Sequence, residues 1–333
     1  MRISMRARWA AVLAAAATAI VLVPATAQAD PEFYEGEIFG IANAPGGALY
    51  VADAGQGIVD ADTGEDIASF GGMNDIAPIG RGDALAAGHH EIEGGVQTGV
   101  FRISRGHVAF VADTAAFEAA VDPADDGTEE GSNPFDLARL NGGKTLLADA
   151  AGNSLLYVDE QGRIDWVATF PARTDIACPP GFCEGTVPFP VHAVPTSVAI
   201  GPDGAYYVGE LTGFPFTPGF SRVWRIEPGT RHADCATSAA CSIVRDDLTA
   251  IIDLQFGPDG RLYVAQLEDA GVGAIEGMGT PVGGSVHACD VTTGDCDEIV
   301  AGLPLLTAIA FHEGELWGAI LALTPDADVV PLT

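Results

Sequence analysis

The stretch AIGPDGAYYVGE, residues 199–210, contains the unit from which the chain is built. Apolar residues lead into a Pro-Asp-Gly turn at 202–204, whose positive φ angles favour glycine. An aromatic pair and further apolar residues follow, and the run stops at the acidic Glu210. This pattern predicts a β-hairpin whose second strand ends on a side chain that accepts hydrogen bonds.

The same unit recurs along the chain. The second glycine of the turn falls at residues 47, 82, 143, 204, 260 and 314, and these spacings fit blades of about 40–50 residues with insertions of variable length. A second hairpin follows in three copies, at 57–70, 155–170 and 285–300. Four antiparallel strands in each of six units predict an all-β fold, a six-bladed β-propeller. A parallel α/β fold is disfavoured, because helical periodicity is absent after residue 29.

The first 29 residues predict a secretory signal peptide. Arg2, Arg6 and Arg8 precede an apolar run, and the small residues Ala27 and Ala29 mark a cleavage site. Residues 30–333 then form a single propeller domain, secreted to the extracellular space or the periplasm. No later apolar run reaches the roughly 20 residues that span a bilayer, so no transmembrane anchor is expected.

The charge balance narrows the range of partners. With 46 acidic and 15 basic residues the formal net charge is −31. Such an acidic surface argues against nucleic acid and anionic membranes as partners. A monomer that binds a small molecule, a glycan or a protein is expected.

The six cysteines lie after the signal peptide, in three close pairs. In an exported chain an even number of cysteines at short spacing predicts disulfides. Zinc is the alternative, but no histidine follows at finger-like spacing. The expected local pairs are Cys178–Cys183, Cys235–Cys241 and Cys289–Cys296.

Insertions interrupt the repeat. Residues 115–132 are expected to form an acidic loop, and residues 211–220 and 268–284 leave their units at equivalent places, so they should crowd one rim. The aromatics of the first rim insertion would offer apolar contact area to a ligand, and their alternative is packing against the neighbouring blade. The candidate ligand-binding residues are Phe214, Phe216, Phe220 and the adjacent Glu210.

The sixth unit is short of a fourth strand. The chain ends soon after it, whereas the segment PEFYEGEIF, residues 31–39, opens the mature chain. We predict that this segment helps to close the ring and removes an exposed sheet edge.

Polar residues recur where the first strand of each unit begins. In a propeller this strand lines the central channel, so these side chains should converge on the axis, where oxygen ligands suit a hard cation such as Ca²⁺. The alternative is that they bond backbone N–H groups between blades. The candidate metal ligands are Asn74, Asp75, Asn133, Asp136 and Asp253, and Thr196 and Thr307 occupy related positions.

A second recurrent set ends the second strands. It consists of Asp53, Asp149, Glu210 and Gln266. Because a catalytic residue is needed only once, recurrence favours a structural role, the ordering of the following turn.

Residues 195–229, PTSVAIGPDGAYYVGELTGFPFTPGFSRVWRIEPG, resemble the ScyD/ScyE family of exported proteins, as do NPFDLARL at 133–140 and the segment 146–162. The resemblance implies a six-bladed propeller without an established reaction. More distantly, the turn-plus-YVAD units resemble NHL-type and gluconolactonase-like propellers. In the latter a channel ring holds a divalent metal that polarises a lactone carbonyl. The corresponding positions of this chain differ from that metal-binding ring, because they combine Thr with Asn and Asp and include no clear Glu.

Two functions follow from these observations. The first is a secreted propeller that serves as a ligand- or protein-binding scaffold, with no assigned reaction and no assigned catalytic residue. The alternative is a divalent-metal-dependent lactonase or related hydrolase at the channel mouth, with calcium as the candidate cofactor.

Overall fold

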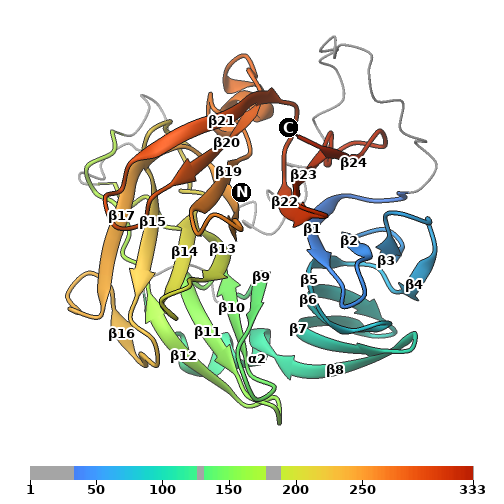
Figure 1. Cartoon of the computed structure of the whole chain (residues 1–333). Coiled ribbons are helices and arrows are strands. Elements are labelled where there is room, and N and C mark those ends of the chain that lie inside the picture. The colour runs from blue at the N-terminus through green and yellow to red at the C-terminus, as the bar shows by residue number, and fades with distance from the viewer. Residues whose placement is uncertain (1–33, 126–130, 178–188, 333) are drawn as a thin grey trace, which may run out of the picture.

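Six small sheets surround a central axis (Figure 1). They are seen in a computed structural model that describes residues 34–125, 131–177 and 189–332. The sheets, called blades 1 to 6 in chain order, are antiparallel apart from one short strand added to blade 3.

The strands of each blade run outward from the axis in chain order. Blade 1 holds β1 (Ile38–Asn43), β2 (Leu49–Asp53), β3 (Gly57–Asp60) and β4 (Asp66–Ser69). Blade 2 holds β5 (Met73–Gly80), β6 (Asp83–Ile92), β7 (Gly95–Ser104) and β8 (His107–Asp113). Blade 3 holds β9 (Pro134–Arg139), β10 (Thr145–Asp149), β11 (Ser154–Val158), β12 (Ile164–Thr169) and the added β16 (Ala233–Asp234). Blade 4 holds β13 (Pro195–Ile200), β14 (Tyr206–Glu210), β15 (Ser221–Ile226) and β17 (Cys241–Leu248). Blade 5 holds β18 (Ile251–Phe256), β19 (Leu262–Gln266), β20 (Gly284–Cys289) and β21 (Cys296–Leu303), and blade 6 holds β22 (Ala308–His312), β23 (Glu315–Ile320) and β24 (Asp328–Pro331).

The six inner strands close a ring. Each inner strand contacts the inner strand of the next blade, and β22 contacts β1. Apolar side chains fill the spaces between blades, as where Leu146 of blade 3 packs with Val208 and Trp224 of blade 4. The arrangement confirms the six-bladed propeller predicted from the repeat.

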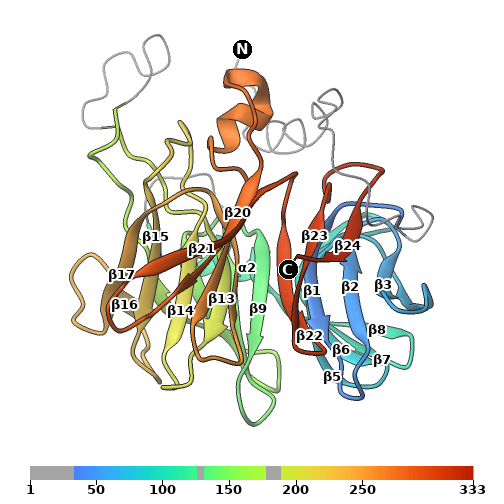
Figure 2. The same ribbon diagram turned by 45° about the horizontal axis from the view of Figure 1, so that its top comes forward.

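The six predicted turn glycines all have positive φ angles, from 73° to 97°. Each lies between the first and second strands of its blade, and these turns gather at the lower end of the molecule in Figure 2. We call this end the turn face. The five-residue helical segment η1 (Ala274–Met278) rises at the opposite end, the insertion face.

The two rim insertions meet on the insertion face, as predicted. Gly271 of the second insertion lies against the first, because a Cβ on Gly271 would come within 2.4 Å of the Phe216 carbonyl oxygen. The predicted outer hairpins of blades 1, 3 and 5 are also present, as β3–β4, β11–β12 and β20–β21.

Two of the three predicted disulfides are present. Cys235–Cys241 closes a loop between β16 and β17, and Cys289–Cys296 joins the two strands of the outer hairpin of blade 5. The predicted pair Cys178–Cys183 lies outside the described residues.

The prediction of a loop at 115–132 was wrong for its first part, where α2 (Thr114–Val121) forms. The segment TAAFEAAV is rich in alanine, and the Asp113 side chain accepts a hydrogen bond from Ala116 N at 2.8 Å, which caps the helix. Residues 126–130 lie outside the described residues. Within the described part of the chain, no helix has the length and apolarity needed to cross a membrane.

Blade 6 has three strands among the described residues. In the segment 31–39, only Ile38 and Phe39 are in a strand, as the start of β1, and residues 34–37 form none. Ile38 N donates to Ala322 O at 3.0 Å, and Tyr34 packs against the apolar cluster between blades 6 and 1. The described part of this segment therefore contacts blade 6 without adding a strand to it. Residues 31–33 lie outside the described residues.

The turn glycines are expected to be needed for their backbone conformation. Gly204→Ala places a Cβ at φ 78° and should lower the free energy of unfolding by about 1 kcal/mol. Gly95→Ala is the matched control, because Gly95 has open space around it and no positive φ. Urea unfolding measures both variants, and equal stability of the two would contradict this account of the turns.

Candidate channel site

Small side chains leave the axis of the propeller open. Alternate residues of a strand face opposite sides of the sheet, so the inner-strand side chains point toward the two neighbouring blades, and consecutive residues of each inner strand border the axis. A cavity of about 420 Å³ lies there, lined by residues from all six inner strands. At the fifth residue of the aligned inner strands it is lined by Ala42, Ala77, Ala138, Ala199, Gln255 and Ala310.

Three aspartates line the same cavity, two residues before this ring. They are Asp75 of blade 2, Asp136 of blade 3 and Asp253 of blade 5. Each carboxylate accepts a hydrogen bond from the backbone of the next blade. The donors are Leu137 N to Asp75 Oδ2 at 3.1 Å, Val198 N to Asp136 Oδ2 at 2.5 Å and Ile309 N to Asp253 Oδ2 at 2.7 Å.

Two threonines make the corresponding contact at other junctions. Thr196 Oγ1 donates to Ile251 O at 2.6 Å, and Thr307 Oγ1 donates to Ile38 O at 2.5 Å. Five of the six junctions therefore carry an inter-blade hydrogen bond from an inner-strand side chain. At the junction of blades 1 and 2, a Cβ on Gly40 would come within 2.2 Å of Asp75 Oδ1. The alternative prediction, that these side chains bond backbone groups between blades, is confirmed for the three aspartates.

Burial changes the acidity of the channel carboxyls. Loss of hydration raises the pKa of Asp75 to about 7. It also raises the pKa of Asp253 to about 8, with a further increase from the charge of Asp136. Asp136 and Asp75 are hydrogen-bonded to one another, and burial together with Asp75 holds the pKa of Asp136 well above its usual range. Near neutral pH the cluster thus retains protons, with one shared between Asp75 and Asp136.

The five predicted metal ligands divide into two groups. Asn74 Nδ2 donates to Asn133 Oδ1 at 3.2 Å and to Pro134 O at 2.9 Å, and neither asparagine lines the cavity. His89 Nε2 also donates to Asn133 Oδ1, at 3.0 Å. Among the described residues no three His, Cys, Asp or Glu side chains converge as a metal site. The arrangement does not fit a calcium ion held by all five residues, which would need six to eight oxygens around one point.

The cavity occupies the half of the channel nearer the turn face. Its lining runs from the aspartates to the ends of the inner strands, at Asn43, Arg139 and Phe256. On the insertion side, Phe39 and Phe135 come from blades 1 and 3, and their ring centroids are 5.4 Å apart in an edge contact. We did not predict the contact between Phe39 and Phe135 from the sequence. We also did not predict the alanines around the axis, although they recur at one strand position in the sequence.

The aromatic insertion is packed onto the propeller. Phe216 packs against a buried cluster that includes Ile252 and Val272, and it meets Phe214 edge-on at 6.0 Å. The guanidinium of Arg173 lies 4.8 Å from the Phe220 ring centroid. These contacts favour the alternative prediction, packing against neighbouring elements. A role in ligand binding stays a prediction.

Glu210, the residue that ends the opening hairpin, is fully buried. Its Oε2 accepts a hydrogen bond from Arg222 Nε at 2.6 Å and its Oε1 accepts one from Trp224 Nε1 at 2.5 Å. Burial raises the pKa of Glu210, and the charge of Arg222 opposes that rise. Both carboxylate oxygens are thus engaged within blade 4, and a contact between Glu210 and a ligand stays a prediction.

The other second-strand ends bind the chain around them, and the predicted ordering of the following turn is confirmed for Asp53 and Asp149. Each accepts a backbone N–H from the segment that leads into its own inner strand. The donors are Glu35 N to Asp53 Oδ2 at 2.7 Å, Asn133 N to Asp149 Oδ1 at 2.7 Å and Thr249 N to Gln266 Oε1 at 2.6 Å. Asp53 and Asp149 also accept from the turns that follow them, at Gly55 and Gly152.

No protein-family model and no curated protein matches this chain. Solved structures do match it. A putative oxidoreductase (glucose dehydrogenase) from Thermus thermophilus is 15% identical, with 90% of this chain and 97% of that chain covered and a TM-score of 0.57. A gluconolactonase from Xanthomonas campestris is 13% identical, with coverages of 90% and 88% and a TM-score of 0.55. A streptogramin B lyase is 13% identical, with coverages of 90% and 84% and a TM-score of 0.51. At these identities the likeness shows the propeller fold alone.

The raised acidities predict a pH-dependent stability. Because the folded pKa values of Asp75 and Asp253 exceed the unfolded value of 3.8, the native state binds more protons than the unfolded state between that value and about 8. Stability is therefore highest near the acidic end of this window and falls as pH rises through it. The loss should be on the order of a few kcal/mol by pH 8.5.

Asp75→Asn tests the source of this effect. The amide can accept from Leu137 N and donate to Asp136 without a shared proton, so we expect a flatter dependence of the melting temperature on pH. Asp66→Asn, which changes an exposed acid in β4, is the control for the change in net charge. The explanation fails if both variants keep the slope of the parent protein.

Proposed function

We propose that this chain is an exported, ligand-binding propeller of the ScyD/ScyE type, and that its ligand is a small molecule with a basic group. The observation that carries the proposal is the axial cavity, to which all six blades contribute residues and which three aspartates line. Its volume of about 420 Å³ is within the range of about 300–1,000 Å³ found for small-molecule sites. The two disulfides support export.

The chemistry of the walls favours an amine with an apolar body. Ala77 and Ala138 offer apolar contact, whereas Asp75, Asp136 and Asp253 offer oxygens in a poorly hydrated site. A cation beside these carboxyls stabilises their ionised forms and lowers their pKa. Binding should therefore release protons and should tighten as pH rises. The net charge of −31 also raises the local concentration of cations.

Calorimetry with a panel of primary amines, such as benzylamine and cadaverine, tests this proposal. Each amine is compared with its neutral counterpart, such as benzyl alcohol, in two buffers of different ionisation enthalpy. We expect the amines alone to bind, with proton release. Ala138→Leu enlarges a residue that lines the cavity and should weaken binding at least tenfold, whereas Ala119→Leu, on the exposed side of α2, should not. Equal binding of amines and neutral counterparts, or full affinity in Ala138→Leu, would overturn the proposal.

The metal-dependent lactonase is the second candidate, because Asp75, Asp136 and Asp253 bring carboxylate oxygens to one cavity. A divalent cation there would have to displace the proton shared by Asp75 and Asp136. A calcium titration by calorimetry and a panel of lactones separate the candidates. Calcium binding with lactone turnover supports the hydrolase, and neither result is expected for the amine-binding propeller.

A further inference from the structure

One segment of blade 4 crosses to blade 3. Residues 228–240, which we call the strap, leave β15 and return to β17, and between them β16 adds to the outer strand of blade 3 (Figure 1). Ala233 and Asp234 pair in parallel with Ala168 and Thr169 of β12. Cys235 N also donates to Thr169 O at 3.0 Å. The strap therefore covers the backbone edge of β12.

Side chains hold the strap in place. The His232 ring stacks on Trp166 with centroids 4.7 Å apart, and its Nε2 lies 2.6 Å from Asp165 Oδ1. The Arg231 guanidinium lies 3.8 Å from the centroid of the Tyr157 ring. The last fixed point is the disulfide from Cys235 to Cys241, the first residue of β17.

The covered edge differs from the other outer edges. β12 reads Ile-Asp-Trp-Val-Ala-Thr, a short, mostly apolar strand whose one charged residue, Asp165, is engaged by the strap. Outer strands with this composition promote pairing between molecules unless something blocks them.

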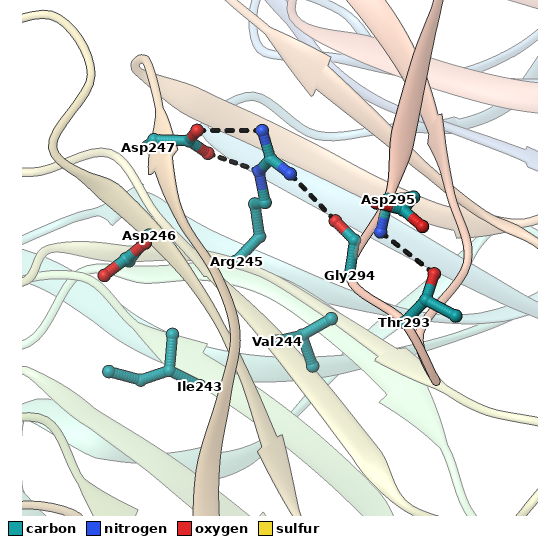
Figure 3. Close-up of a pocket in the computed structure, with 8 residues that line it drawn as sticks. All are labelled: Ile243, Val244, Arg245, Asp246, Asp247, Thr293, Gly294 and Asp295. Carbon is teal, nitrogen blue, oxygen red and sulfur yellow. Dashed lines mark hydrogen bonds and ion pairs between the residues drawn. The ribbon is translucent and has the colours of Figure 1, made fainter.

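Other outer strands carry their own protection. Figure 3 shows the outer edge of blade 4, where β17 presents Arg245, Asp246 and Asp247 and where Arg245 donates to Gly294 O of blade 5 at 2.9 Å. β21 presents Asp297 and Glu298, and β4 and β24 are only four residues long. The edge of β8 lies beneath the turn at Gly162, where a Cβ would come within 2.1 Å of Val111 O.

We propose that the strap is an edge cap that keeps the chain monomeric, and that its release lets β12 pair with β12 of a second copy. The sequence of β12 suits a second copy as the occupant. In a centred antiparallel pair Asp165 faces Ala168, so no like charges lie opposite one another. Pairing of this kind would be concentration-dependent and would place each Trp166 opposite Val167 of the other copy.

The test uses a strap variant with Arg231→Ala, His232→Ala, Cys235→Ser and Cys241→Ser. The matched control is Cys289→Ser with Cys296→Ser, which opens a disulfide of similar loop length in the outer hairpin of blade 5, a hairpin that adds no strand to another blade. Hydrogen exchange of the peptide 164–169 reports whether the edge is uncovered, and light scattering over a range of concentrations reports self-association. Circular dichroism checks that each variant is folded.

We expect at least tenfold faster exchange of 164–169 and concentration-dependent dimers in the strap variant, and neither in the control. Adding Ile164→Lys to the strap variant places a charge on the uncovered strand and should restore the monomer. His232→Ala alone keeps the disulfide and should give a smaller increase in exchange, which preserves a readout if the fourfold variant does not fold. Unchanged exchange, or faster exchange without dimers, would overturn the proposal.

Discussion

The side-chain hydrogen bonds that join one inner strand to the next hold the blades in register around the axis. Each blade buries its apolar faces against two neighbours, but apolar packing alone does not specify how far one sheet slides past another. A carboxylate or hydroxyl that must meet one particular backbone group in the next blade does specify it. Asp75, Asp136 and Asp253 reach N–H groups, and Thr196 and Thr307 reach carbonyls, so the same task is done with two chemistries.

These bonds also explain why the channel carries acids that stay partly protonated. To reach the next blade, each aspartate must sit where hydration is poor, and the three then lie close enough to affect one another's acidity. Two residues further along, Ala77 and Ala138 leave room that larger side chains would have filled, whereas blade 5 carries Gln255 there. The fold thus creates a cavity whose carboxyl groups serve primarily to join one blade to the next. A ligand that brings its own positive charge can use them without breaking the contacts between blades.

Much of the fold was predictable from the sequence, because the turns of a propeller repeat a strict backbone requirement. All six glycines fell where positive φ is needed, and the outer hairpins and two disulfides followed from local spacing. The helix α2 was not predicted because the whole segment 115–132 was interpreted as an acidic loop. Its first part is rich in alanine and follows the capping residue Asp113, and both features favour a helix. For the site, the position of Asp75, Asp136 and Asp253 along one cavity was predictable from their common strand position. The position of Asn74 and Asn133 away from the cavity was not predictable. It depends on hydrogen bonds to Pro134 and His89 that only the three-dimensional structure brings together.

The bond from Thr307 to Ile38 joins residues 269 positions apart, whereas the other inner-strand bonds join residues 55 to 62 apart. Closing so long a loop costs more chain entropy than docking a blade onto the preceding one. A chain that folds from one end would therefore build an open arc of blades first and join its two ends last. On this view the junction of blades 6 and 1 is the place where the ring forms late and opens early, so the lifetime of the closed molecule is governed there rather than in any single blade.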